Sequence, residues 1–208
     1  MEEKFMKKIS LLLVIALLVS SFVFQISANA AESDVVKIRL PFDSAKLSGN
    51  KWGKFASGGG GQYHIAEDYV SVKDGKVYAC ADGVVKGKWS DSKTIGCGLY
   101  IQHTINGETF CAEYGHITNI PDPLKKVGAP VKCGDLLGYV CQKKDSKKPG
   151  YLATFKYATH LHWSIKPGAW KGGKWYAGSD KDLYYSSPEA VKKAGFVNPS
   201  DYIKKKIK

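Results

Sequence analysis

The chain has 208 residues, 44% of them apolar, and a formal net charge of +12. This length fits a single domain with a core of its own. Nearly all of the positive charge comes from lysine, with Arg39 as the only arginine. Proteins that recognise nucleic-acid bases favour arginine, so the composition argues against a nucleic-acid partner and suits a soluble surface or an anionic partner surface.

The first 30 residues have the pattern of a secretory signal peptide. Three lysines lie near the start, an apolar run covers residues 11–24, and Ala28–Ala30 forms a small-residue cleavage site. We expect cleavage after Ala30, which removes three lysines and two glutamates and leaves a secreted chain with a net charge of +11. An uncleaved membrane anchor is the alternative, because the apolar run is long for a signal peptide.

A lead-in over residues 31–50 precedes one predicted domain at residues 51–208. The glycine run Gly58–Gly61 predicts a flexible loop that leads into His64. Short strand-like runs follow, with hairpin turns predicted at Asp82-Gly83 and Asn106-Gly107, and another strand region covers residues 131–141.

The late segment 186–196 predicts a short helix. Ser187 can cap it, Pro188 fits its first position, Glu189 complements its dipole, and Gly195 can end it. Many short strands with one short C-terminal helix predict a mainly all-β fold, either a curved antiparallel sheet or a sandwich.

Residues 160–165 alternate between polar and apolar side chains, which is the period of a strand with one buried face. The polar face carries His160, His162 and Ser164. Two imidazoles on one face suit a functional site, although a solvent-exposed face with two incidental histidines explains the same pattern.

His64 and Asp68 are four residues apart, which places both side chains on one side of a strand or of a helical turn. A histidine and a carboxylate are common zinc ligands. The H-x-x-x-D spacing is also frequent by chance, so a loop histidine and a surface carboxylate remain the alternative.

The Asn106-Gly107 turn fixes the register of its predicted hairpin. His103 then faces Phe110 beside the turn, as a structural or surface histidine. His116 faces Cys97 at the far end, next to a loop, where functional groups tend to lie. The two histidines are about 20 Å apart along the ladder, so one metal cannot bind both.

The sequence contains five cysteines, none of them spaced C-x-x-C, which argues against a cysteine-based zinc finger. Export permits disulfides, but the odd number leaves at least one thiol without a partner in the chain. The hairpin register places Cys97 and Cys111 about 16 Å apart, so we predict no bond between them.

Together these motifs resemble those of the lysostaphin- and LytM-type zinc metalloendopeptidases, a family of peptidoglycan-cleaving glycyl-glycine endopeptidases. The H-x-x-x-D at 64–68, the Y-G-H around His116 and the H-x-H at 160–162 occur in the family order. Segments 76–85 and 131–140 resemble the family's intervening segments. The resemblance covers residues 61–166, and residues 168–208 form a C-terminal extension.

The resemblance implies an antiparallel sheet that bears a substrate groove with one zinc ion on its floor. His64, Asp68 and His162 match the zinc ligands, and His116 and His160 match the catalytic histidines. Three protein ligands leave one zinc position for a water nucleophile, and a neutral histidine can take its proton. Which of the two catalytic histidines is the base stays open.

We therefore expect a secreted or cell-wall-associated zinc endopeptidase that cleaves peptide crosslinks of peptidoglycan and is attracted to anionic wall polymers. No stable membrane span is expected after signal removal. The link over residues 142–159 is longer than is usual in the family, which predicts a changed substrate rim. The alternatives are a non-catalytic wall-binding or scaffold protein of the same fold, and a zinc peptidase acting on soluble glycine-rich peptides.

Overall fold

The structure is a computed structural model that describes residues 37–56, 61–91, 96–140, 160–173, 175 and 185–207. These residues belong to one compact unit, Lys37–Lys208. The expected signal peptide, the glycines at 58–60, Cys141 and the link over 142–159 lie outside the described residues. Within the described ranges, no helix is long and apolar enough to cross a membrane.

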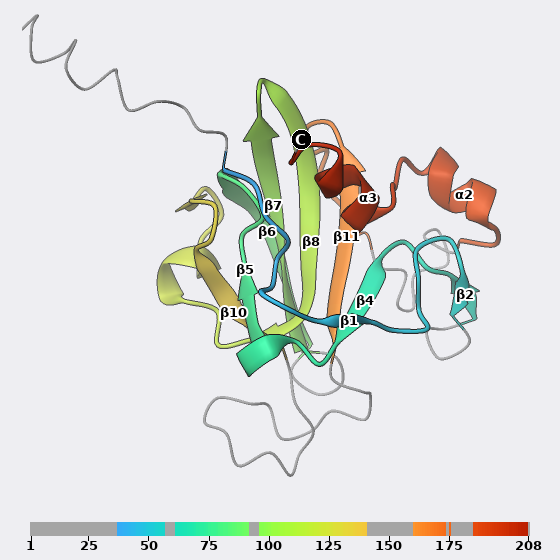
Figure 1. The fold of residues 1–208 in the computed structure, drawn as a ribbon. Coiled ribbons are helices and arrows are strands. Elements are labelled where there is room, and N and C mark those ends of the chain that lie inside the picture. The colour runs from blue at the N-terminus through green and yellow to red at the C-terminus, as the bar shows by residue number, and fades with distance from the viewer. Residues whose placement is uncertain are drawn as a thin grey trace, which may run out of the picture. The chain divides into compact units, whose positions relative to one another are not determined.

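The described residues form mainly antiparallel β-structure, as predicted (Figure 1). The main sheet runs in the order β1-β4-β11-β8-β7-β6-β9, with β10 paired to both β5 and β8, while β2 and β3 form a separate pair. The strands are β1 (Lys46–Leu47), β2 (Phe55–Ala56), β3 (Gln62–Tyr63), β4 (Glu67–Val70), β5 (Lys76–Tyr78), β6 (Gly83–Asp91), β7 (Gly96–Ile105), β8 (Glu108–Thr118), β9 (Pro130–Val131), β10 (Leu136–Val140) and β11 (Leu161–Pro167).

Short helices complete the unit. Two 3₁₀ turns, η1 (Lys73–Gly75) and η2 (Asp122–Lys125), lie between strands, and α2 (Pro188–Lys193) and α3 (Pro199–Lys204) lie near the C-terminus. The Ser187 side chain caps α2 as predicted, by accepting a hydrogen bond from the Ala190 amide. The sequence analysis did not predict α3, although Asn198 before Pro199 repeats the same cap-and-proline pattern.

The two predicted hairpins have different outcomes. Asn106-Gly107 does join β7 and β8, with His103 opposite Phe110 as expected. The Asp82-Gly83 hairpin is wrong, because β5 pairs with β10 whereas β6 pairs with β7 and β9. Instead of closing a turn, the Asp82 carboxylate accepts a hydrogen bond from the Cys133 amide at 2.8 Å.

The predicted absence of a bond between Cys97 and Cys111 is confirmed. Cys111 lies opposite Gln102, far along the ladder from Cys97, and both thiols are free. Their separation follows from the register that the Asn106-Gly107 turn imposes.

The central strands β8 and β11 separate a hydrophobic core from the face that carries the site. Leu161, Trp163 and Ile165 of β11 are fully buried in that core, together with Tyr114 of β8, as the alternation predicted. The intervening residues point to the opposite face, which carries His162 and Ser164. Both are nevertheless buried, and a second hydrophobic cluster, which includes Ile65, Trp175 and Phe196, packs on this side of the sheet.

Candidate metal centre

The strand register brings Asp68 and His162 together. His162 on β11 lies directly opposite Asp68 on β4 and, at its other edge, opposite Gly115 on β8. Directly opposed residues in an antiparallel pair share a face of the sheet, so both side chains project to the same side. Both are almost fully buried, at 3% relative exposure each.

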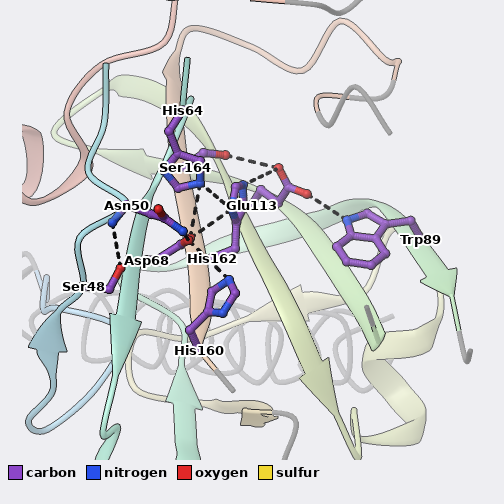
Figure 2. A network of polar contacts seen from close by, with 9 residues as sticks. All are labelled: Ser48, Asn50, His64, Asp68, Trp89, Glu113, His160, His162 and Ser164. Carbon is purple, nitrogen blue, oxygen red and sulfur yellow. Dashed lines mark hydrogen bonds and ion pairs between the residues drawn. The ribbon is translucent and has the colours of Figure 1, made fainter. Parts of the chain in front are cut away.

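His64 completes a triangle of potential ligand atoms with this pair (Figure 2). His64 Nε2 lies 3.2 Å from His162 Nδ1 and 3.3 Å from Asp68 Oδ1, and His162 Nδ1 lies 3.2 Å from the same oxygen. His64 precedes β4, and its backbone is held by hydrogen bonds to Gly53 and Lys54. The predicted ligands, separated by almost a hundred positions in the chain, therefore converge.

The triangle fits a zinc ion. Ligands about 2.0–2.1 Å from a tetrahedral zinc lie about 3.3–3.4 Å from one another. The three measured separations, 3.2, 3.2 and 3.3 Å, are close to that spacing. Two imidazoles and one carboxylate are also ligands that zinc accepts, and they leave a fourth position for water or substrate.

Burial and mutual charge shift the protonation of the three groups. Burial, together with neighbouring His162, outweighs the attraction of Asp68 and lowers the pKa of His64 to about 4, so the imidazole is neutral at pH 7. Burial acts to raise the pKa of Asp68, but the contact with His162 and the nearby imidazoles outweigh it and hold this pKa well below its usual range. Burial likewise acts against charge on His162, but Asp68 raises the pKa of that imidazole overall.

The second oxygen of Asp68 has its own partners. Asn50 Nδ2 donates to Asp68 Oδ2 at 3.1 Å, and His160 Nε2 lies 3.4 Å from the same oxygen. The Asn50 carbonyl also accepts a hydrogen bond from the Asp68 amide. These contacts orient the carboxylate so that Oδ1 faces the two other ligands (Figure 2).

His116 and His160 lie beside the triangle. Their ring centroids are 4.6 Å apart, and the His116 ring is 5.6 Å from that of His162. His160 immediately precedes β11, and its side chain keeps 16% of its surface exposed. The structure thus brings together all five residues that the resemblance assigned to the site.

The predicted partner of His116 is wrong. Cys97 lies opposite Ile117 and Gly98 lies opposite Gly115, so His116 is the extra residue of a β-bulge. Its φ of 59° is in the left-handed region, which is rarely adopted by residues other than glycine. Bulges re-aim side chains next to functional sites, and this one directs His116 toward His160.

A buried carboxylate, Glu113, is a site residue that the sequence analysis missed. Trp89 Nε1 donates to Glu113 Oε1 at 2.8 Å, Ser164 Oγ donates to Oε2 at 3.2 Å, and His162 Nε2 lies 4.0 Å from Oε2. A signal was present, since Glu113 is an acidic residue within the largely apolar run Phe110–Tyr114 that leads to His116.

Trp89 reaches Glu113 by lying across a glycine. A Cβ at Gly98, which is opposite Trp89 on β7, would lie 2.3 Å from the indole Nε1. No side chain fits there without moving the ring. The same indole lies against His116, with ring centroids 5.9 Å apart, so Trp89 lines the site.

His103, the fifth histidine, lies in the core on the opposite side of the sheet. Its Nδ1 bonds the Ala81 carbonyl and its Nε2 bonds the Tyr114 hydroxyl, both at 2.9 Å. The Tyr114 hydroxyl in turn accepts from the Cys80 amide. His103 is therefore a structural residue, which is one of the two roles expected for it.

Comparison with known proteins identifies the family of this chain. A model described as peptidase family M23 matches residues 62–174, more than half of the chain. The chain belongs to peptidase family M23. This M23 match includes His64, Asp68, His116, His160 and His162, and members of the family are zinc metallopeptidases that act on peptide substrates.

Several solved structures are similar to this chain. The catalytic domain of lysostaphin from Staphylococcus simulans is 18% identical, with a TM-score of 0.46, over 76% of this chain and 92% of that one. CbpA from L. salivarius REN is 22% identical, with a TM-score of 0.48, over 82% and 97%. A zinc-containing peptidase from Vibrio cholerae is 22% identical, with a TM-score of 0.45, over 64% of this chain and only 37% of that one. The search of curated proteins found no match.

Proposed function

We propose that this M23 peptidase is an exported zinc-dependent endopeptidase that hydrolyses the peptide crosslinks of bacterial peptidoglycan. The observation that carries the proposal is the buried triangle of His64 Nε2, Asp68 Oδ1 and His162 Nδ1, whose sides match the ligand spacing of tetrahedral zinc. A site with three protein ligands suits catalysis, because purely structural zinc sites use four.

His64, Asp68 and His162 would hold the metal. A zinc ion bound there supplies Lewis-acid chemistry, which activates water and polarises a peptide carbonyl at neutral pH. The low pKa of His64 keeps its Nε2 lone pair available as a ligand. Asn50 Nδ2 donates a hydrogen bond to Asp68 Oδ2, which keeps the carboxylate oriented with Oδ1 toward the metal position.

His160 and His116 carry the proton transfers. The two rings are 4.6 Å apart beside the triangle, so both can reach the same reacting atoms. One imidazole takes a proton from the attacking water, and the other donates a hydrogen bond to the oxygen that becomes negative. Either histidine fits either role, and the proton is later delivered to the leaving amine.

Peptidoglycan as substrate is supported by the sequence as well as by the family. The N-terminal segment predicts export, and the lysine-rich mature chain would be attracted to anionic wall polymers. The described residues of the site show no feature tied to one particular crosslink, so the proposal covers the class of wall peptides.

Digestion of purified peptidoglycans tests the proposal. We expect the zinc-loaded chain to release peptide fragments from at least one wall type, with mass analysis identifying the cleaved bond. His160→Ala is the matched control, since it leaves the three ligands in place. Equal release by wild type and His160→Ala would contradict the proposed chemistry.

Two other outcomes favour the alternative functions. Zinc binding with tight association to peptidoglycan but no released fragments would indicate a binding or scaffold protein. Cleavage of soluble glycine-rich peptides with intact peptidoglycan left untouched would indicate a peptidase for soluble substrates. The presence of both His116 and His160 beside the triangle favours catalysis, because a scaffold needs neither.

A further inference from the structure

Glu113 is a buried carboxylate that the proposed reaction does not use. It lies on β8, on the face of the sheet that carries His162, and it is fully buried. Burying a carboxylate is costly unless other groups satisfy it. The partners that satisfy Glu113 therefore indicate what this side chain does.

Both oxygens of Glu113 are fixed by hydrogen-bond donors (Figure 2). The Trp89 indole donates to Oε1 at 2.8 Å and the Ser164 hydroxyl donates to Oε2 at 3.2 Å. Two donors aimed at the two oxygens use the acceptor capacity of the carboxyl group. The group is therefore held in one orientation, with Oε2 turned toward β11.

On β11, Oε2 faces the imidazole of a predicted metal ligand. His162 Nε2 lies 4.0 Å from Glu113 Oε2, whereas His162 Nδ1 lies 3.2 Å from Asp68 Oδ1. A neutral imidazole carries one proton, and only the nitrogen without it can bind a metal. A carboxylate beside Nε2 favours the proton on that nitrogen and leaves the Nδ1 lone pair directed at the triangle.

We propose that Glu113 is a positioning residue that sets the tautomer and ring orientation of His162 for metal binding, and that Trp89 and Ser164 hold Glu113 in place for this task. The inference rests on the zinc site of the proposed function and is independent of the substrate. It also explains why the Trp89 indole lies across Gly98, the position that lets it reach the carboxylate.

A purely structural role for Glu113 is the competing explanation, and the chain offers a matched control. Glu67 on β4 is also buried, at 2% exposure, and accepts hydrogen bonds from Tyr69 Oη at 2.9 Å and from the Ser200 amide at 3.0 Å. It lies opposite Trp163, on the core face, and so away from the triangle. Replacing it changes a comparable buried, hydrogen-bonded carboxyl group without changing a predicted ligand.

The test measures zinc affinity by competition with a chromophoric chelator, together with the melting temperature of the metal-free protein. We expect Glu113→Gln to weaken zinc binding by about 10- to 100-fold, the usual effect of losing such a partner. Glu67→Gln should lower the melting temperature but leave the zinc Kd of the folded protein unchanged. An unchanged zinc Kd in Glu113→Gln, or equal losses in the two variants, would overturn the inference.

Two further variants keep the test decisive if Glu113→Gln does not fold. Ser164→Ala and Trp89→Phe each remove one donor to Glu113 and leave the carboxylate in place. We expect each to weaken zinc binding by about threefold or more, through loss of carboxylate orientation. Wild-type zinc affinity in both variants would refute the positioning role, whereas failure of the wild-type chain to bind zinc would refute the proposed function itself.

Discussion

His162 and Asp68 lie directly opposite each other on β11 and β4, with His162 Nδ1 3.2 Å from Asp68 Oδ1. The candidate metal site therefore depends on strand register. A slip of one residue between these strands would turn one of the two side chains to the core face and abolish the site. The site therefore exists only when the sheet is correctly paired.

Removal of a ligand should remove the metal and the activity together. We expect His162→Ala to lose zinc at stoichiometric concentrations and to lose turnover, because two ligands cannot hold the ion as three do. Atomic absorption on the purified variant checks the metal, and fragment release from peptidoglycan checks turnover. His103→Gln, which changes the histidine on the other side of the sheet, should keep one zinc per chain.

Metal removal should be reversible in the wild type. A chelator is expected to abolish activity and added zinc to restore it, because the ligands remain intact. Activity that persists in the metal-free protein would contradict a zinc mechanism. The measurement is peptidoglycan turnover before chelation, after chelation and after reloading.

The two histidines beside the triangle should separate metal binding from chemistry. We expect His160→Ala and His116→Ala to keep zinc and to lower kcat/KM by about 10²- to 10⁴-fold, the range for loss of a general acid or base. Zinc content and steady-state kinetics on the same preparations check both parts. Loss of zinc from His160→Ala would show that His160 is a ligand and that the division of roles is wrong.

Asn50 should contribute to zinc affinity through Asp68. Asn50→Ala removes the amide that donates to Asp68 Oδ2 at 3.1 Å, and we expect zinc binding to weaken by about tenfold. Asn198→Ala is the control, since it removes the cap of α3 and should cost about 1 kcal/mol of stability without changing zinc affinity. Chelator competition compares the two, and similar zinc affinities in them would contradict the role of Asn50.

Buried His103 should make stability depend on pH. Its folded-state pKa is lowered to about 4 by burial, below the 6.5 of an unperturbed histidine. Between these values the unfolded chain binds more protons, so stability is complete above pH 6.5 and falls as the pH drops toward 4. The loss in the free energy of unfolding on acidification that is due to His103 is about 3 kcal/mol at most.

Urea unfolding of the metal-free protein at several pH values measures this dependence. His103→Gln removes the titrating group, and its unfolding free energy should fall less steeply than that of the wild type between pH 6.5 and 4. The difference between the two slopes isolates His103 from the site histidines. Parallel slopes would show that His103 is not the group responsible.

Much of the fold could be predicted from local patterns. The Asn106-Gly107 turn, the alternation over residues 160–165 and the Ser187-Pro188 helix start each determine structure within a few residues, and all three are observed. The Asp82-Gly83 hairpin failed because contacts remote in sequence, such as the Cys133 amide, determine the conformation of that segment.

The same division applies to the site. The amino-acid order alone was enough to predict which residue types were available. It placed His64 and Asp68 on one side of a short segment and His160 and His162 on one face of a strand, in a motif order that resembles one peptidase family. Such information is local because the period of a strand and the chemistry of a side chain do not depend on the rest of the chain.

How these groups meet depends on the folded arrangement of the strands. The bulge that re-aims His116, the Glu113 carboxylate behind His162 and the triangle with sides of 3.2–3.3 Å all arise from pairing between β4, β11, β8 and β7. The His116 bulge is one extra residue in the β7–β8 ladder, and Glu113 lies on the strand next to the one that carries His162. The direction of His116 and the contact between Glu113 and His162 cannot be read along the chain, because both depend on which strands become neighbours and in which register.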